Sequence, residues 1–179
     1  MKKLIMFAAC AMLAAYTQAA TVGWSMAGAS AFAGDKYMFF IEGQNGVESV
    51  AALTALLDAG TDVSAMAYGS GVLASNGAGT MAPAASGKEL GAGTYTGFFV
   101  LFDSATPVAG ESKYVTIATA NLVKEVSSTS ANVSFAAGNT STIVNNSANW
   151  ASYGAIPEPT SGLLMLVGLG ALALRRRRA

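Results

Sequence analysis

Few side chains in this 179-residue sequence can carry out nucleophilic, acid–base or metal chemistry. There is no histidine, and the only cysteine is Cys10. This composition excludes serine–histidine–aspartate and cysteine–histidine nucleophilic sites and almost every zinc site. The sequence also lacks the P-loop, the GxGxxG fingerprint after a strand, the HExxH motif and the EF-hand loop. We therefore expect no catalytic residue, no cofactor and no metal, and we expect that the protein is not an enzyme.

Carboxylates are the remaining candidates for chemistry. Residues 20–156 contain four lysines and nine acidic residues, a net charge of −5, and the acidic residues are Asp35, Glu42, Glu48, Asp58, Asp62, Glu89, Asp103, Glu111 and Glu125. An acidic domain without a basic cluster is a poor match to a phosphate backbone, so nucleic acid is excluded as a partner. A paired-carboxylate hydrolase needs two of these groups within about 10 Å in a cleft. No two of them occur in a pattern that sets such a geometry.

Two smaller groups of residues have two interpretations each. Asp58 and Asp62 can hold calcium through carboxylate and carbonyl oxygens, or they can be a helix end followed by a polar turn, which we favour. Trp24, Trp150 and Tyr153 can form a surface on which sugar rings stack, or they can be buried aromatics of strands.

The N-terminus has the composition of an export signal. Two lysines precede an apolar run over residues 4–15, and Thr17 and Ala19 supply the small residues of a cleavage site. The run is shorter than the roughly 20 apolar residues that span a bilayer. Residues 1–19 are therefore predicted to be a signal peptide, which implies Sec-type export machinery and a signal peptidase as partners. The mature chain then begins at Ala20.

Cys10 allows a second interpretation of this end, as the lipidated cysteine of a lipoprotein. Cleavage before Cys10 would leave an apolar core of only residues 4–9, whereas the apolar sequence continues to Ala15. We therefore favour cleavage after Ala19 and no lipid. The mature chain then has no cysteine, so its stability must come from a hydrophobic core rather than from disulfides.

The C-terminal tail has three parts in a fixed order. The first is the triplet Pro157, Glu158 and Pro159, and the second is the apolar run 161–174. The third is a basic cluster of four residues, Arg175, Arg176, Arg177 and Arg178. The prolines hold the triplet extended, and the arginines stay in the cytoplasm. Fourteen helical residues rise only about 21 Å against about 30 Å of hydrocarbon, so the run predicts a transient membrane anchor.

This tail resembles the PEP-CTERM sorting domain that exosortase recognises in Gram-negative-type bacteria, over residues 156–178. The resemblance implies that Pro157, Glu158 and Pro159 are read by an exosortase-like processing enzyme at the inner membrane. It also implies delivery to the cell surface or extracellular matrix, often beside exopolysaccharide. A plain membrane anchor is the alternative. A Gram-positive sortase tail fits less well, because the threonine of its motif comes one residue late, at Thr160.

Alternating apolar residues between the two signals predict a mainly β domain, a small antiparallel sandwich or barrel-like fold. The expected strands are 22–26, 36–42, 94–103, 113–119 and 131–135. Residues 98–102 are apolar on both faces, so the strand that contains them should be central and covered on both sides.

One α-helix, about 47–58, is predicted from apolar residues at helical spacing after a capping-box-like Asn45–Glu48. Residues 69–93 should be largely loop, with one strand near 71–74. The predicted order is signal peptide 1–19 in a signal helix, β-rich domain 20–137, polar linker 138–155, and sorting signal 156–179 with a short transmembrane helix.

Together these features predict an exported, non-catalytic protein of the cell surface or extracellular matrix, associated with exopolysaccharide. It would be held briefly at the inner membrane by its C-terminal segment. The alternative is a carbohydrate-binding module on the cell surface, which requires aromatic side chains along one exposed face.

Overall fold

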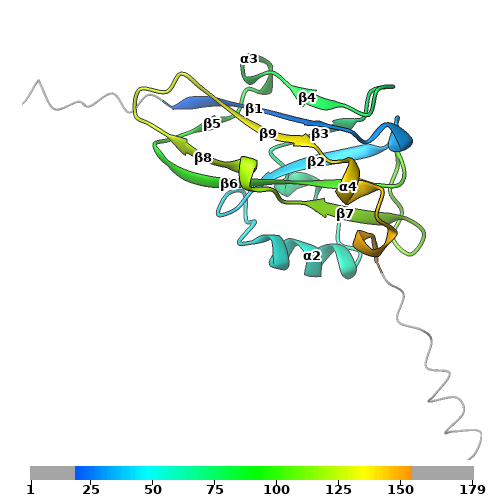
Figure 1. The fold of residues 1–179 in the computed structure, drawn as a ribbon. Coiled ribbons are helices and arrows are strands. Elements are labelled where there is room, and N and C mark those ends of the chain that lie inside the picture. Colours follow the sequence, from blue (N-terminus) through cyan, green and yellow to red (C-terminus); the bar gives the residue numbers. More distant parts are fainter. Residues whose placement is uncertain (1–18, 155–179) are drawn as a thin grey trace, which may run out of the picture.

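Residues 19–154 are described by a computed structural model, in which two β-sheets face each other and a helix covers the outer face of the second sheet (Figure 1). Residues 1–18 of the predicted signal peptide, Thr17 among them, lie outside the described residues, and so do the sorting triplet and the four arginines. The two terminal helices expected there are therefore not described. Within 19–154, no helix has the length and apolar character needed to cross a membrane.

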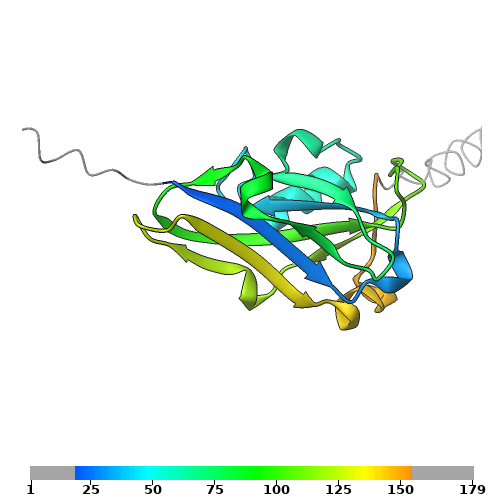
Figure 2. The ribbon, with the colours of Figure 1, turned by 90° about the horizontal axis from the view of Figure 1, so that it is seen from above.

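The first sheet is built around β1 (Ala20–Ala27), which pairs with three strands. β4 (Gly79–Met81) and β5 (Glu89–Leu90) run antiparallel to it, whereas β9 (Asn132–Asn139) runs parallel to it (Figure 2). The expectation of an entirely antiparallel fold is therefore wrong. Most of the domain separates β1 from β9, so no hairpin dictates their direction, and a long connection permits parallel pairing.

The second sheet is larger and wholly antiparallel. Its main order is β10 (Ala151–Ser152), β7 (Lys113–Ile117), β6 (Gly93–Phe102), β2 (Lys36–Ile41) and β3 (Gly69–Val72). β8 (Val123–Val126) pairs with the first half of β6. The five strands expected from the sequence are confirmed, in this sheet or the first, and β6 is central as predicted.

Alternation along β2 and β6 produces two separate cores. Phe39 and Phe99 point toward the first sheet and join its core, while Phe40 and Phe98 point toward the helix side. All four of these rings are fully buried. The prediction that the apolar run in β6 is covered on both faces is confirmed.

The helix α2 (Val50–Asp58) is confirmed, but its predicted start is wrong. Asn45 and Gly46 have φ of 51° and 82°, the backbone of a tight turn, so they cannot begin a helix. Ser49 is the N-cap instead, and its side chain accepts a hydrogen bond from the Ala52 amide at 3.1 Å. Two further helices of one turn each are α3 (Pro83–Ser86) and α4 (Ser141–Val144), so the expectation of a single helix is also wrong.

The glycine-rich stretch 69–93 holds more structure than expected, because β3, β4, α3 and β5 all lie in it. Its glycines make room for rings of the core. A Cβ at Gly69 would lie 2.4 Å from the Trp24 ring, and one at Gly79 would lie 2.7 Å from the Tyr37 ring. Glycine therefore serves here for close packing within short strands rather than for loop flexibility.

The polar linker predicted for residues 138–155 is wrong for residues 138–154, which pack on the domain. Thr140 is fully buried, and both its amide and its hydroxyl donate to the Ala27 carbonyl at 2.8 Å. Val144 and Tyr153 are also buried. A few apolar anchors in a polar stretch are enough to hold it, because each buried side chain contributes about 1.5–3 kcal/mol.

Candidate functional site

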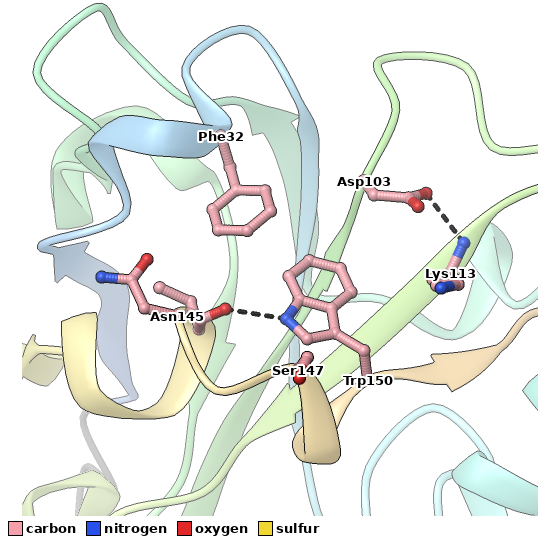
Figure 3. A pocket seen from close by; sticks show the side chains of 7 residues that line it. Phe32, Asp103, Lys113, Asn145, Ser147 and Trp150 are labelled. Carbon is pink, nitrogen blue, oxygen red and sulfur yellow. Dashed lines mark hydrogen bonds between the residues drawn. The ribbon is translucent and has the colours of Figure 1, made fainter.

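A surface pocket of about 340 Å³ lies at the end of the domain where the C-terminal segment packs (Figure 3). Four parts of the chain form it: the turn after β1, the end of β6, the start of β7, and the segment from α4 to β10. Its lining residues are Phe32, Asp103, Lys113, Val144, Asn145, Ser147 and Trp150. The pocket thus exists only because distant segments converge.

An aromatic pair forms the apolar part of the pocket. The rings of Phe32 and Trp150 stack with centroids 4.8 Å apart and an interplanar angle of 28°. Trp150 Nε1 donates to the Val144 carbonyl oxygen at 2.7 Å, which sets the orientation of the indole (Figure 3). Both rings are partly buried against the first core. The pair is therefore held rigidly while part of each ring faces solvent.

Polar side chains surround this pair. The Asp103 carboxylate accepts a hydrogen bond from the Lys113 backbone amide at 2.7 Å, and the side chains of Lys113, Asn145 and Ser147 are exposed. Amide, hydroxyl, ammonium and carboxylate groups beside a rigid aromatic pair can hydrogen-bond the hydroxyls of a small polar ligand that stacks on the rings.

Asp35 directly precedes β2 and lies near enough to Asp103 of this pocket for their charges to interact. Burial, and next the negative charge of Asp103, raise the pKa of Asp35 above its ordinary value. No local pattern indicates this pair, because Asp35 precedes β2, Asp103 follows β6, and only the pairing of the two strands brings them near each other.

The three aromatic residues proposed as a sugar surface are not on one face. Trp24 is 2% exposed and stacks on Phe39 inside the first core. Tyr153 is 8% exposed and contacts Phe102 edge-on in the second core. Trp150 borders the pocket described above, whereas Tyr153 lines a different hollow with Phe102, Lys36 and Asp62. The proposed surface of Trp24, Trp150 and Tyr153 is therefore wrong. The aromatic residue that packs on Trp150 is Phe32.

Asp58 and Asp62 each have a protein partner. Asp58 accepts a hydrogen bond from the Tyr114 hydroxyl at 2.7 Å, which ties the end of α2 to β7. Hydrogen bonds from the hydroxyl and then the amide of Ser64 lower the pKa of Asp62. Within residues 19–154 no group of three or more Asp, Glu, Cys or His side chains is arranged to hold a metal ion. The two aspartates are bound into a helix end and a turn.

The two predicted processing sites lie next to folded structure. Ala19, the last residue of the predicted signal peptide, directly precedes β1. Tyr153 is buried, and the Gly154 amide donates to the Leu57 carbonyl at 2.8 Å, only three residues before Pro157. The two ends of the described chain lie at opposite ends of the domain (Figures 1 and 2).

Sequence reasoning missed Phe32, Asp103, Lys113, Asn145 and Ser147 as pocket residues. Phe32 is an isolated aromatic in an Ala/Gly-rich turn, and Asn145 and Ser147 lie in the stretch taken for a linker. The position of Phe32 between two alanines is the one local feature that could have indicated a pocket residue.

Comparisons with curated proteins and with solved structures give no match for this chain. The resemblance found in the tail is confirmed, because residues 155–178 match the PEP-CTERM protein-sorting motif. The matched range contains the triplet from Pro157 to Pro159 and all four arginines. The chain therefore carries a PEP-CTERM protein-sorting motif at its C-terminal end, the signal of an exported protein sorted by an exosortase.

Proposed function

We propose that this protein is a non-catalytic component of the cell surface or extracellular matrix. The Sec machinery exports it, signal peptidase releases it after Ala19, and the tail holds it briefly at the inner membrane. An exosortase-type enzyme then processes the tail, and the β domain is delivered outside. The PEP-CTERM motif at residues 155–178 is the observation that carries this proposal.

Two properties of the domain support a structural role. The domain buries most of its large aromatic residues in two cores, which suits a stable exported module without disulfides. Its chain lacks histidine entirely and has no cysteine after Cys10, so two side chains common in acid–base and nucleophilic catalysis are missing from the domain.

The sorting step is tested by Glu158→Gln in a bacterium that carries an exosortase. We expect the parent protein in the surface fraction with a shortened C-terminus, measured by intact mass. The Glu158→Gln protein should stay full-length in the membrane fraction. Glu48→Gln is the matched control, because Glu48 is exposed on the domain and outside the motif. Recovery of a parent chain that still ends at Ala179 would instead identify a plain membrane anchor.

A second candidate function is carbohydrate binding at the pocket of Phe32 and Trp150. A half-exposed, rigid aromatic pair with amide, hydroxyl and carboxylate groups around it supports this alternative. Sugars present both an apolar ring face and hydroxyls, so such a pocket matches both of their surfaces.

This alternative is tested with the extracellular polysaccharide of the producing bacterium as the probe, in affinity electrophoresis of the purified domain. We expect Trp150→Ala and Asn145→Ala to abolish retardation in the gel. Asn121→Ala is the matched control, because Asn121 is an exposed asparagine outside the pocket. Equal mobility of the parent protein with and without polysaccharide would remove carbohydrate binding as a candidate.

A further inference from the structure

The sorting triplet has very little free chain between it and the folded domain. Gly154 is the last described residue, and Pro157 begins the triplet three residues later. A fully extended chain covers at most about 3.6 Å per residue, so Pro157 lies within about 11 Å of Gly154. An enzyme that binds an extended peptide contacts several consecutive residues of it. Four residues upstream of Pro157 already include Tyr153.

Residues 150–154, which we name the C-terminal strap, are attached to the domain at several points. Trp150 stacks on Phe32, and β10 pairs with β7 through Ala151 and Ser152. The Tyr153 amide donates to the Ser112 carbonyl at 2.9 Å. Tyr153 and Gly154 make further contacts. The Tyr153 carbonyl accepts from the Gly110 amide at 2.7 Å, and its hydroxyl donates to the Thr61 carbonyl at 3.4 Å. The Tyr153 ring contacts Phe102, and the Gly154 amide donates to the Leu57 carbonyl.

Opening of the strap would leave the central strand pairs of the second sheet in place. β10 has two residues and is the edge strand of the second sheet, where its only strand partner among the described residues is β7. Removal of an edge strand leaves the central pairs of β6 with β2 and β7 intact. Such peripheral elements open locally at a smaller free energy than global unfolding.

We propose that the attached C-terminal strap restrains processing of the tail, and that the processing enzyme acts on the chain whose strap has opened. This proposal rests on the proposed function, since it requires that the tail is processed. When opening and closing are fast compared with cleavage, the processing rate follows the fraction of open chains. The strap therefore couples removal of the tail to the packing of the last residues of the domain.

The test combines two changes in a bacterium with an exosortase. The first is a ten-residue Gly/Ser spacer between Ala155 and Ile156, and the second is Tyr153→Ala, which removes the buried ring of the strap. The half-life of the full-length precursor is measured by pulse–chase. We expect each change alone to shorten the half-life at least threefold. In the chain with the spacer, Tyr153→Ala should have no further effect.

Val133→Ala is the matched control, because Val133 is a core residue of the first sheet, on β9 and away from the strap. It should leave the half-life unchanged with and without the spacer. Equal half-lives of the parent and the spacer chain would overturn the strap proposal while the sorting function stands. If no chain loses its tail, the proposed function fails and the strap proposal fails with it.

Hydrogen exchange on the full-length protein in detergent gives a readout that does not depend on the enzyme. The amides of Tyr153 and Gly154 should exchange at least tenfold faster than that of Val100 in the centre of β6. Tyr153→Ala should accelerate the Gly154 amide and leave the Val100 amide unchanged. Exchange of Gly154 at the rate of Val100 in the parent protein would mean that the strap opens only with the whole domain, which would also overturn the proposal.

Discussion

The two faces of the second sheet are covered in different ways. The face toward the first sheet is closed by stacked and tilted aromatic rings, as where Trp24 lies 5.2 Å from Phe39 between ring centroids. The face toward α2 also carries aromatic pairs, such as Phe40 on Phe98, but α2 itself covers them with aliphatic side chains such as Leu57 and with the hydrogen bond from Tyr114 to Asp58. Aromatic rings thus join the two sheets, whereas aliphatic side chains and a hydrogen bond join α2 to its sheet.

This difference predicts how each layer fails. Large buried rings contribute several kcal/mol each, whereas a hydrogen bond contributes about 1 kcal/mol net. The core between the sheets should therefore decide whether the domain folds at all. The helix layer should loosen locally when one of its anchors is removed, while the sheets remain paired.

The largest effect is expected for Phe99→Asp. Phe99 is fully buried between the sheets, so the substitution places an unpaired charge in an apolar core and should abolish cooperative folding. Thermal unfolding followed by circular dichroism should show no transition. Ser134→Asp, which adds the same charge at an exposed position of β9, should keep a midpoint close to that of the parent. A normal transition in Phe99→Asp would show that this core does not control folding.

Leu57→Ala sharpens the comparison, with Leu101→Ala as its counterpart in the core between the sheets. Both leucines are fully buried, so each truncation should reduce the free energy of unfolding by about 2–5 kcal/mol. Hydrogen exchange should separate the two variants. Leu57→Ala should accelerate exchange in α2 more than in β1, and Leu101→Ala should accelerate both together. Equal acceleration in both variants would mean that the two layers unfold as one unit.

Tyr114→Phe should have a smaller effect, because it removes one hydrogen bond between α2 and β7, a loss of about 1 kcal/mol. Burial, and next the hydrogen bond and negative charge of Asp58, raise the pKa of Tyr114. Above about pH 10 Tyr114 loses its proton in the unfolded chain but keeps it in the folded protein. The contribution of Tyr114 to the free energy of unfolding is therefore fully present below about pH 10 and is lost as the pH rises above it. Urea unfolding from pH 8 to 11 should show a shallower decline for Tyr114→Phe than for the parent. An identical decline in both proteins would show that Tyr114 does not contribute to the loss of stability at high pH.

The smallest effect is expected for Asp35→Asn. The raised pKa of Asp35 means that folding favours its protonated form, so ionisation of Asp35 destabilises the folded state as pH rises through this pKa. Asp35 is only partly buried, and solvent reduces the effect. Asp35→Asn should be slightly more stable than the parent at pH 7 and equal to it at pH 3, by urea unfolding. A difference that is the same at both pH values would rule out charge as its cause.

Local patterns predicted the strands and the helix well where each element has its own periodicity. β6 is the clearest example, because a run of five apolar residues requires cover on both faces. Predictions failed where a residue type has more than one use. Asn45 has the side chain of a helix cap but the backbone of a turn, and glycines that usually mark loops make space for Trp24 and Tyr37 in short strands.

Of the residues that line the pocket, Trp150 alone was expected from the sequence to contact a ligand. Its other members come from four separate segments, and none of them has a local signal that points to the rest. The sugar surface failed for the same reason, since burial of Trp24 and Tyr153 depends on which segments pack over them.

The sequence by itself determined the sorting motif of this protein, because a signal that a processing enzyme reads is short and linear. The PEP-CTERM motif needs no partner elsewhere in the chain to be recognised. The tertiary structure alone decided the parallel pairing of β1 with β9, the aromatic pocket and the attachment of residues 138–154. Each of these depends on contacts between residues far apart in the chain, whose free energy is gained only when the whole domain has folded.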